Sequence, residues 1–452
     1  MANTYLTRTP SSGGNRKTFT ISAWFKRSKL ATTQIFFQAA TDGSTRSQIT
    51  LRSDDMLQFY SENGGVAKIN VRTNRVLRDT SAWYHVVVAV DTTQGTASNR
   101  LKIYINGVQE TSLHTATYGD QNYDTQFNHT VAHTIGRRDA YGDMYFDGLM
   151  SHFHLVDGTA LTASTFGSQD ATTGEWKINT SPSYTPGTNG FFVLKDTNSG
   201  TDQSANTNNL TVNGTLTKTE DCPSNVFATL DPLNVPASNA PTFSNGNTKV
   251  VTSTGGNFGA SSTLGASSGK YYFEIKFTAE SSSNMGNISL SSSSNARESA
   301  RTNQHSNQLS ASFPNLLYEY DGNVYKDSTS TVANYGTYAV GDIIIIAMDL
   351  DNQKAYFGKN GAWGNSGVPT SGSTGTGAAT LSANNDFWHL ALGDRNSSAT
   401  ATYEVNFGNG YFGTTAVATN SGNGYAGAEG SSIFNYQPPT GYSALSTKGL
   451  NT

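Results

Sequence analysis

Hydrophobic and polar residues alternate along much of this chain with a period of two. In residues 18–26, one face would carry Phe19, Ile21, Ala23 and Phe25, and the other Thr20, Ser22, Trp24 and Lys26. This alternation is typical of a β-strand that buries one face. Similar short runs are separated by Gly, Asn and Asp, and the clearest are 34–39, 48–52, 56–60, 67–71, 131–136 and 144–156. Their spacing predicts an antiparallel β-sandwich.

Two matching strand–turn–strand signatures lie in different halves of the chain. The first joins residues 83–91 to 101–108, and the second joins residues 342–349 to 354–361. In each, a β-rich run ends in Asp, and a later aromatic strand is closed by Asn-Gly. Asn-Gly accepts the positive φ angles of a tight hairpin turn, so both copies predict antiparallel strands. We therefore expect an all-β chain with two antiparallel, jelly-roll-like β-sandwich domains.

Between the two signatures the alternation becomes weaker. Residues 159–241 contain repeated prolines, and residues 196–219 are mostly Asn, Ser, Thr and Gly, which is typical of loops and linkers. We expect a first sandwich over residues 1–195, an ordered Pro/Asn/Ser-rich connector over residues 196–241 and a second sandwich over residues 242–452. The tail from Tyr411 onward is expected to wrap over the second domain.

Charge and hydropathy limit the possible partners. The formal net charge is −4 and 14% of residues are charged, whereas nucleic-acid binding usually requires clustered Lys and Arg. The basic groups, Arg72 with Arg75 and Arg78, and Arg137-Arg138, are short and isolated, so we expect no nucleic-acid partner. The longest apolar run, residues 343–348, is too short to cross a bilayer, so we also expect no membrane insertion.

The N-terminus and the cysteine content suggest where the protein is made. Residues 1–10 are polar and do not resemble a signal peptide, so we expect synthesis in a cytoplasm. Cys222 is the single cysteine, which rules out an intrachain disulfide. Beside Pro223, it is expected to be a packed thiol rather than a nucleophile.

The sequence contains no clear motif for a pair of catalytic carboxylates. A retaining glycosidase needs two carboxylates about 5–5.5 Å apart, and a Glu-X-Asp-X-Glu strand would supply them. The chain lacks this motif, and its nearest approach is Glu319-Tyr320-Asp321, followed by Gly322-Asn323. Gly-Asn favours a hairpin turn at this position. We therefore expect no catalytic residues and no enzyme activity.

Three histidines are candidate metal ligands. His152 and His154 share one face of the strand predicted at 148–156, and His133 could lie nearby. Imidazoles at this spacing can bind zinc, but no third ligand follows at a recognisable spacing. The neighbours Met150 and Val156 favour a half-buried surface instead. We expect no metal and no cofactor.

Several segments, taken in order, resemble one known family. Residues 5–24, Trp83-Tyr84-His85-Val86 and Ile103-Tyr104-Ile105-Asn106-Gly107 resemble laminin-G/concanavalin-like modules of marine bacteriophage structural proteins, and residues 221–233 resemble the connector of such proteins. The second half, with residues 269–274, 349–361 and 434–442, is similar to a SPRY domain and its closing segment. The resemblance implies a virion protein, tail-fibre-like or surface-exposed, that binds bacterial surface glycans.

A sugar-binding site is expected to contain aromatic residues next to Asp, Asn or Gly in loops between strands. Residues 137–145 fit this description best, because they join two predicted strands and contain Asp139, Tyr141, Asp143 and Tyr145. Loops on rigid scaffolds commonly carry function. The alternative is that these are ordinary surface tyrosines, of which a β protein holds many.

Five further residues are candidates for the same chemistry. Tyr118 and Tyr123 lie in another polar loop that could converge on residues 137–145. In the SPRY-like half, Tyr320, Asp321 and Trp363 lie at strand ends, where the resemblance places ligand loops.

The sequence leaves three functions open. The first is a non-enzymatic virion adhesin that binds host surface polysaccharide and has other virion proteins as partners. The second is a capsid decoration or connector protein that stabilises the particle through contacts of residues 196–241. The third is a glycan depolymerase with carboxylates from distant segments. Because virion assemblies are built by symmetric repetition, we expect a homo-oligomer located in the virion.

Overall fold

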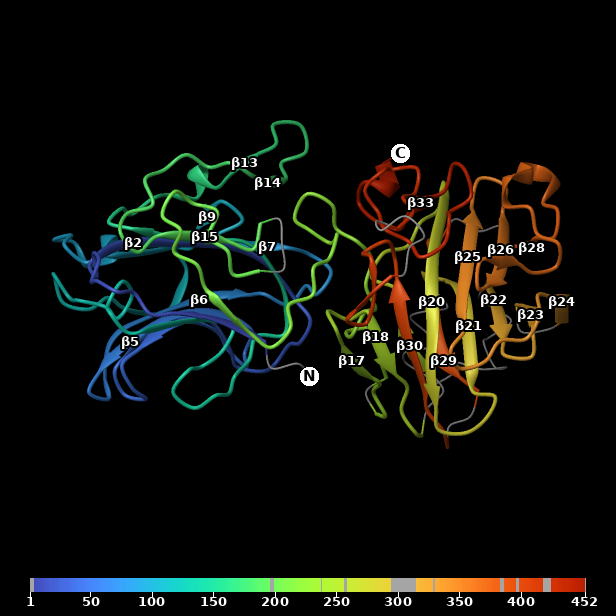
Figure 1. Ribbon diagram of the computed structural model, residues 1–452, viewed down its shortest axis with the longest axis horizontal. Coiled ribbons are helices and arrows are strands. Elements are labelled where there is room, and N and C mark those ends of the chain that lie inside the picture. Colours follow the sequence, from blue (N-terminus) through green and yellow to red (C-terminus); the bar gives the residue numbers. More distant parts are fainter. Residues whose placement is uncertain are drawn as a thin grey trace. The chain divides into compact units, whose positions relative to one another are not determined.

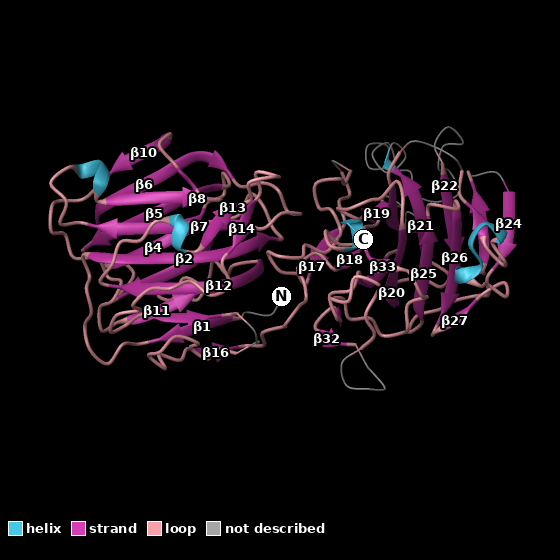
Figure 2. Ribbon diagram, turned by 90° about the horizontal axis from the view of Figure 1, so that it is seen from above, coloured by secondary structure: helices cyan, strands magenta, loops and turns pink. Residues whose placement is uncertain are grey.

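The chain folds into two compact units. The computed structural model describes residues 4–195, 199–236, 238–255, 258–293, 314–327, 330–382, 386–395, 398–417 and 424–451. The units are Met1–Lys218 and Thr219–Thr452. Both are β-sandwiches whose strands are almost all antiparallel, which confirms the fold class predicted from the sequence (Figures 1 and 2). Within the described ranges, no helix is long and apolar enough to span a bilayer.

In the first unit, the described residues form an eight-stranded and a six-stranded sheet. Figure 1 shows them as two layers, with β5 and β6 in one and β2 and β7 in the other. Across the eight-stranded sheet the order is β10 (Leu113–Thr117), β6 (Val66–Val76), β5 (Met56–Asn63), β4 (Arg46–Leu51), β3 (Gln34–Ala40), β11 (Ala132–Ile135), β1 (Tyr5–Arg8) and β16 (Thr211–Asn213). Across the six-stranded sheet it is β15 (Phe191–Val193), β12 (Gly148–Asp157), β2 (Thr18–Arg27), β7 (Tyr84–Asp91), β8 (Leu101–Ile105) and β9 (Val108–Gln109). The other elements are the hairpin of β13 (Gly167–Gln169) and β14 (Trp176–Ile178) and the 3-10 turns η1 (Ala97–Asn99) and η2 (Ala163–Thr165).

The core of the first unit contains the inward residues of the predicted alternation. Phe19, Ile21 and Phe25 of β2 are at most 1% exposed. They belong to one cluster with Phe37 and Phe59 of the eight-stranded sheet. Burial of such side chains is the main term that stabilises a two-layer sandwich.

Both Asn-Gly pairs form the turns that the sequence predicts. Asn106-Gly107 has φ angles of 47° and 81°, and Asn360-Gly361 has 50° and 83°. Two positive φ angles in succession fit a type I′ hairpin turn. In each copy the Asn side chain also accepts a hydrogen bond from the neighbouring strand, from the His85 N–H at 2.8 Å and from the Ile343 N–H at 2.9 Å. The repeated signature therefore builds the same corner in both units.

The second unit, in its described residues, has a nine-stranded and a six-stranded sheet. The nine-stranded sheet runs β17 (Thr242–Ser244), β18 (Lys249–Val251), β30 (Ala401–Asn406), β20 (Lys270–Glu280), β25 (Ile343–Asp349), β26 (Lys354–Lys359) and β27 (Ala362–Trp363), with β28 (Ala379–Thr380) on β26 and β33 (Ser443–Ala444) parallel to β20. The other sheet runs β19 (Phe258–Ser261), β29 (Trp388–Asp394), β21 (Gly286–Ser292), β22 (Asn315–Glu319), β23 (Asn323–Lys326) and β24 (Ser330–Asn334). The remaining elements are β31 (Tyr411–Phe412), β32 (Thr415–Ala416), η3 (Pro369–Thr374) and η4 (Gly449–Asn451).

Residues 196–241, expected as a connector, are divided between the two units. β16 extends the eight-stranded sheet by pairing with β1. Leu210 is 5% exposed in the core of the first unit. Phe227 and Leu230 are buried in the second unit. Each side of the expected connector therefore contributes apolar residues to one sandwich, although its polar composition is that of a linker.

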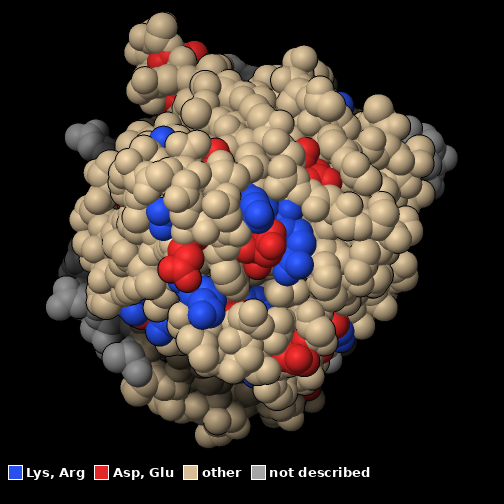
Figure 3. Space-filling view, turned by 90° about the vertical axis from the view of Figure 1, so that its left-hand side faces the viewer, with Lys and Arg blue, Asp and Glu red and all other residues tan. Residues whose placement is uncertain are grey.

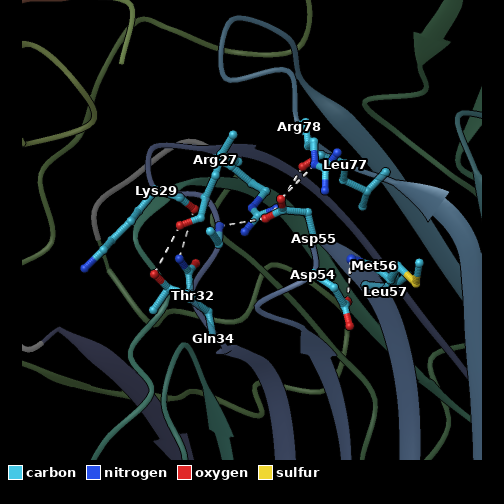
Figure 4. A network of polar contacts seen from close by, with 12 residues as sticks. Arg27, Lys29, Thr32, Gln34, Asp54, Asp55, Met56, Leu57, Leu77 and Arg78 are labelled. Carbon is cyan, nitrogen blue, oxygen red and sulfur yellow. Dashed lines mark hydrogen bonds and ion pairs between the residues drawn. The ribbon is translucent and has the colours of Figure 1, made fainter. Parts of the chain in front are cut away.

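A buried ion pair closes one end of the first sandwich (Figure 4). The Arg27 side chain is fully buried, and its Nη1 donates to Asp55 Oδ1 at 3.0 Å and to the Leu77 carbonyl at 2.8 Å. Asp55 also accepts from the Ala31 N–H at 2.8 Å and from Arg78 Nε at 2.9 Å. Burial raises the pKa of Asp55, but these donors outweigh it and hold the pKa below its usual value. Asp55, which directly precedes β5, is thereby joined to the end of β2 and to the segment that follows β6.

In the second unit, the tail segment 434–442 packs on the outer face of the nine-stranded sheet, whereas β33 pairs with β20 and Leu445 belongs to the core between the sheets. Tyr272 and Ile345 project from that face and pack with Phe434 and Tyr442 of the tail. Below this contact, the fully buried Glu274 accepts four hydrogen bonds. The donors are the N–H groups of Asn435 and Tyr436, at 2.9 and 2.8 Å, the Tyr272 hydroxyl at 3.0 Å and Asn406 Nδ2 at 3.1 Å. Burial raises the pKa of Glu274 to about 7, against these donors, which lower it.

Glu274→Gln is expected to loosen the tail. An amide NH2 would replace one oxygen and face a donor, so the free energy of unfolding of the second unit should fall by about 1–3 kcal/mol. Hydrogen exchange should show faster exchange of the amides of residues 424–451 and unchanged exchange in the first unit. As a control, Glu404→Gln removes the ion pair with Lys249, which solvent reaches on the lysine side, and should cost less than about 1 kcal/mol. Wild-type exchange of the tail in Glu274→Gln would show that the carboxylate does not hold it.

Candidate functional site

The loop of residues 137–145, between β11 and β12, lies across the outer face of the eight-stranded sheet. Near the start of β3, the Ile35 N–H donates to the Met144 carbonyl of the loop at 2.9 Å. In the middle of β3, Gln38 Oε1 accepts from the Asp139 N–H at 2.8 Å. Tyr141 reaches the turn after β3, since a Cβ on Gly43 would lie 2.4 Å from its hydroxyl. The loop therefore follows β3 from end to end, which explains why Gln38 is fully buried on an outer face.

Two arginine–aspartate pairs hold the 137–145 loop in shape. Arg138 donates from Nε and Nη2 to the two oxygens of Asp143, at 2.6 and 2.5 Å. Arg137 donates to Asp139 at 2.5 Å. The hydrogen bonds within the first pair raise the pKa of Arg138 and lower the pKa of Asp143, so both groups are charged at neutral pH. A two-point pair also fixes the plane of the guanidinium.

Each of these guanidinium groups lies against a tyrosine ring. Arg138 Cζ is 4.3 Å from the ring centroid of Tyr141, and Arg137 Cζ is 3.6 Å from that of Tyr5. Tyr5 in turn meets Tyr145 edge-on, with 6.2 Å between centroids. Tyr141 is 62% exposed. Its ring is therefore an exposed aromatic surface that a fixed cation holds in place.

A second group of side chains is linked to the turn after β3, which Tyr141 also reaches. Arg46 donates to the Gly43 carbonyl and pairs with Glu62 at 2.7 Å. Tyr60 donates its hydroxyl to Glu62 at 2.9 Å, and Arg46 Cζ lies 5.9 Å from its ring centroid. Sequence reasoning did not select Arg46, Tyr60 or Glu62. The alternation of β5 was the available signal, because it places Tyr60 and Glu62 on the outer face.

Amide and hydroxyl side chains form a row on the same face. By strand register the row consists of Thr134, Gln38, Gln48, Tyr60 and Asn70. Gln38 donates to Gln48 at 2.9 Å. The buried amides form a floor under the loop, whereas Tyr60 and Asn70 are half-buried and reach solvent.

Charges of opposite sign lie next to each other in the first unit. Figure 3 looks at one end of this unit, where basic and acidic side chains are adjacent. The pairs Arg46–Glu62, Arg137–Asp139 and Arg138–Asp143 follow the same pattern around Tyr141. These charges are therefore paired and do not form the basic stretch that a phosphate backbone requires.

Tyr118 and Tyr123 do not converge on the 137–145 loop, so that expectation was wrong. Both pack against the core between the two sheets. The Tyr123 hydroxyl is 3.1 Å from Ser61 Oγ, and Ser61 lies on the inner face of β5. These rings close the interior of the sandwich, on the opposite side of the sheet from Tyr141.

The three candidates in the second unit lie at strand ends but belong to different layers. Asp321 accepts from the Asn323 N–H at 3.0 Å within the β22–β23 turn, which confirms the predicted hairpin. Tyr320 packs against the core between the sheets and accepts from Arg395 at 2.8 Å. Trp363 packs on the outer face of the nine-stranded sheet, edge-on to Tyr272. The structure therefore does not gather Tyr320, Asp321 and Trp363 into one site.

Comparison with known families bears on the first unit. Residues 2–165 match the laminin G-type model of the concanavalin A-like lectin/glucanase superfamily. The first unit contains a concanavalin-like domain. This match confirms the laminin-G/concanavalin-like module expected from the sequence, and no curated protein matches the chain.

Three solved structures illustrate what the chain is similar to. The SPRY domain of human HERC1 has 18% identity and a TM-score of 0.29, with 39% of this chain and 96% of that chain covered. Mouse laminin alpha1 domains LG4-5 have 10% identity and a TM-score of 0.27, with 92% of both chains covered. A putative carbohydrate binding protein from Bacteroides ovatus has 20% identity and a TM-score of 0.30, with 47% and 58% covered.

In the concanavalin-like unit, His152 and His154 share the outer face of the six-stranded sheet with His85. From this face His154 stacks on Phe192, with 3.9 Å between ring centroids, and His152 meets the same ring at a tilt, with 5.6 Å between centroids. His133 instead packs in the core against Phe127, so it does not lie near them. Among the residues that the structure describes, no group of three or more His, Cys, Asp or Glu is placed to hold a metal ion.

Two hydrogen bonds fix the tautomer of His85. Trp176 Nε1 donates to His85 Nδ1 at 2.9 Å, and Ser22 Oγ lies 2.9 Å from Nε2. Because an indole N–H only donates, Nδ1 accepts, and neutral His85 carries its proton on Nε2. Burial lowers the pKa of His85 to about 3. Trp176 belongs to the β13–β14 hairpin, which covers this face (Figure 1).

The first unit is expected to lose stability in acid through His85. Its pKa is lowered on folding from 6.5 to about 3, so its stabilising contribution is complete above pH 6.5 and declines as the pH falls towards 3, by up to about 1.4 kcal/mol per pH unit. His85→Gln keeps an acceptor and a donor but does not titrate. Chemical denaturation at a series of pH values should give a shallower acid slope for this variant.

Groups that do not interact with His85 affect both proteins equally, so the difference between the two pH profiles reports His85 together with its coupling to His152 and His154. His114→Gln, at an exposed position of β10, serves as the control and should keep the wild-type profile. Parallel profiles for wild type and His85→Gln would contradict the prediction.

Proposed function

We propose that the concanavalin-like unit binds a glycan on Tyr141, with the 137–145 loop and the turn after β3 as the rim of the site. The exposed ring of Tyr141, held by the ion-paired Arg138, carries this proposal. An aromatic ring can stack on the apolar face of a sugar. A ring that is already fixed in place loses little conformational entropy when the ligand binds.

Polar groups next to the ring fit the same ligand. Tyr60, Glu62 and Arg46 lie at the turn that Tyr141 meets, and half-buried Asn70 continues the row. Ligand sites combine apolar surface with a few placed polar groups. The family description of residues 2–165, which names lectins and glucanases, also supports a glycan-binding role.

The carboxylates near Tyr141 favour binding over hydrolysis. A glycosidase needs a general acid with a raised pKa, whereas pairing with Arg138 lowers the pKa of Asp143. Glu274, whose pKa is raised to about 7, is fully buried beneath the tail of the other unit. A polysaccharide cannot reach it there. We therefore propose a non-enzymatic binding protein.

The location that we propose is the bacteriophage particle. The ordered resemblance of residues 5–24, 83–86, 103–107, 221–233 and the SPRY-like half to phage structural proteins supports it. The ligand is then a host surface polysaccharide, the partners are other virion proteins, and the chain acts as a symmetric homo-oligomer. A decoration role is the alternative, but residues 196–241 give it less support than their sequence suggested. Their buried residues Leu210 and Phe227 pack within single units.

Tyr141→Ala is expected to weaken glycan binding about tenfold or more, as the loss of an aromatic anchor does. Its ring is 62% exposed, so the stability of the unit should change little. A glycan array of bacterial surface oligosaccharides, probed with the full chain, would identify ligands, and titration calorimetry would measure the change.

Two further variants make this test specific. Phe387→Ala removes an aromatic ring of similar exposure (52%) from the other unit and should bind as wild type. Gly43→Ala adds a methyl group where the Tyr141 hydroxyl lies and should weaken binding by moving the ring. If the array shows no ligand, or if Tyr141→Ala binds as wild type, Tyr141 is not a glycan site.

Electron cryomicroscopy of intact particles tests the proposed location. The expected map contains symmetry-related copies of the chain with the 137–145 loop directed outward. Burial of this loop against neighbouring subunits would instead support an assembly role, with Tyr141 as a contact between proteins. Absence of the chain from particles would contradict both.

A further inference from the structure

The geometry points to a neutral glycan, built from uncharged sugar units, as the ligand of the Tyr141 site. This inference rests on the proposed function and adds the chemical class of the ligand. The reason is that the arginines near Tyr141 and near the turn after β3 are already paired with carboxylates.

Arg138 is the cation nearest to Tyr141, and its charge is already compensated. Its Nε and Nη2 donate to both oxygens of Asp143, and its plane lies over the Tyr141 ring. A uronate or sulfate group would have to replace Asp143 to obtain the same two-point contact. Breaking a two-point, charge-assisted pair removes a strong interaction, so the site disfavours this exchange.

The other two cations of the site are each paired with a carboxylate through one contact. Arg46 pairs with Glu62 and also donates to the Gly43 carbonyl. Arg137 pairs with Asp139 and lies on the Tyr5 ring. The Arg46 and Arg137 side chains are only 17% and 15% exposed, so neither offers a free guanidinium to an anionic sugar.

A carboxylate at the rim also opposes an acidic ligand. Asp42, next to Gly43, is exposed and accepts from the N–H and hydroxyl of Ser44, which lower its pKa. It is negative at neutral pH and would repel a uronate or sulfate, whereas the charge of Asp143 is compensated by Arg138. Specificity commonly uses such a repulsive element together with attractive contacts.

Salt dependence separates the two ligand classes. A neutral sugar stacked on Tyr141 makes no ion pair, so its affinity should not change between about 50 and about 300 mM NaCl. An acidic glycan held by arginine would bind more weakly at the higher salt concentration.

The experiment compares immobilised neutral hexose oligosaccharides with uronic acid-containing and sulfated oligosaccharides, using the full chain at both salt concentrations. Retention on neutral oligosaccharides that does not depend on salt is the expected result. Retention on acidic oligosaccharides alone, weakening with salt, would overturn the inference but leave the glycan-binding function in place. Retention on neither class would overturn the proposed function itself.

Asp143→Asn tests whether the pairing of Arg138 with Asp143 determines the ligand class. The substitution leaves Arg138 with an uncompensated charge. The variant should therefore be retained on acidic oligosaccharides, and this retention should fall about threefold or more over the same range of salt. Asp170→Asn, the control, breaks the exposed Asp170–Lys177 pair of the β13–β14 hairpin and should behave as wild type. If Asp143→Asn gains no acidic ligand, pairing with Asp143 does not determine the ligand class.

Discussion

Loops in both units depend on buried carboxylates that accept hydrogen bonds from the backbone N–H groups of other segments. The carboxylates are Asp55, Asp157, Asp202 and Glu274, each at most 7% exposed. Asp55 accepts from the N–H of residue 31, and Asp157 accepts from the N–H groups of residues 15 and 189. Asp202 accepts from those of residues 192 and 208, and Glu274 from those of residues 435 and 436. A buried carboxylate only accepts, and its burial is costly unless donors surround it. The same contact therefore satisfies the charge and fixes the loop, which helps a chain with 35% hydrophobic residues to order long polar segments.

With the loops fixed, the outer faces of the sheets differ in what covers them. Trp176 and its hairpin pack on the six-stranded sheet of the first unit, and residues 434–442 pack on the nine-stranded sheet of the second. These covers are largely aromatic and close the face beneath them. The eight-stranded sheet carries the short 137–145 loop on a floor of amides, and Tyr60 and Asn70 remain half-buried beside it. The outer face of the eight-stranded sheet is therefore the less completely covered one, and Tyr141 lies on it.

Local patterns predicted much of the fold but only part of this site. The alternation of β2 and the two Asn-Gly turns were predictable because strand period and φ preference are properties of neighbouring residues. The path of the 137–145 loop was not, because the contact of Tyr141 with Gly43 joins residues far apart in the chain. Tyr118 and Tyr123 were misjudged since an aromatic residue in a polar loop gives the same pattern whether it points inward or outward. Residues 196–219 looked like a linker because they are mostly Asn, Ser, Thr and Gly, yet Leu210 and Val212 among them complete the edge of a sandwich.

The arginine–aspartate pairs of the loop have a consequence beyond stability. Ion pairs that solvent reaches usually contribute between about 0 and 1 kcal/mol, so the Arg138–Asp143 pair, whose side chains are 20% and 47% exposed, adds little to the fold. Its geometric effect is larger, because two-point pairing fixes the guanidinium that lies on Tyr141. Its electrostatic effect is to cancel the charge nearest to the ring. Rigidity and neutrality at Tyr141 therefore have the same cause, and a substitution that frees Arg138 would alter both together.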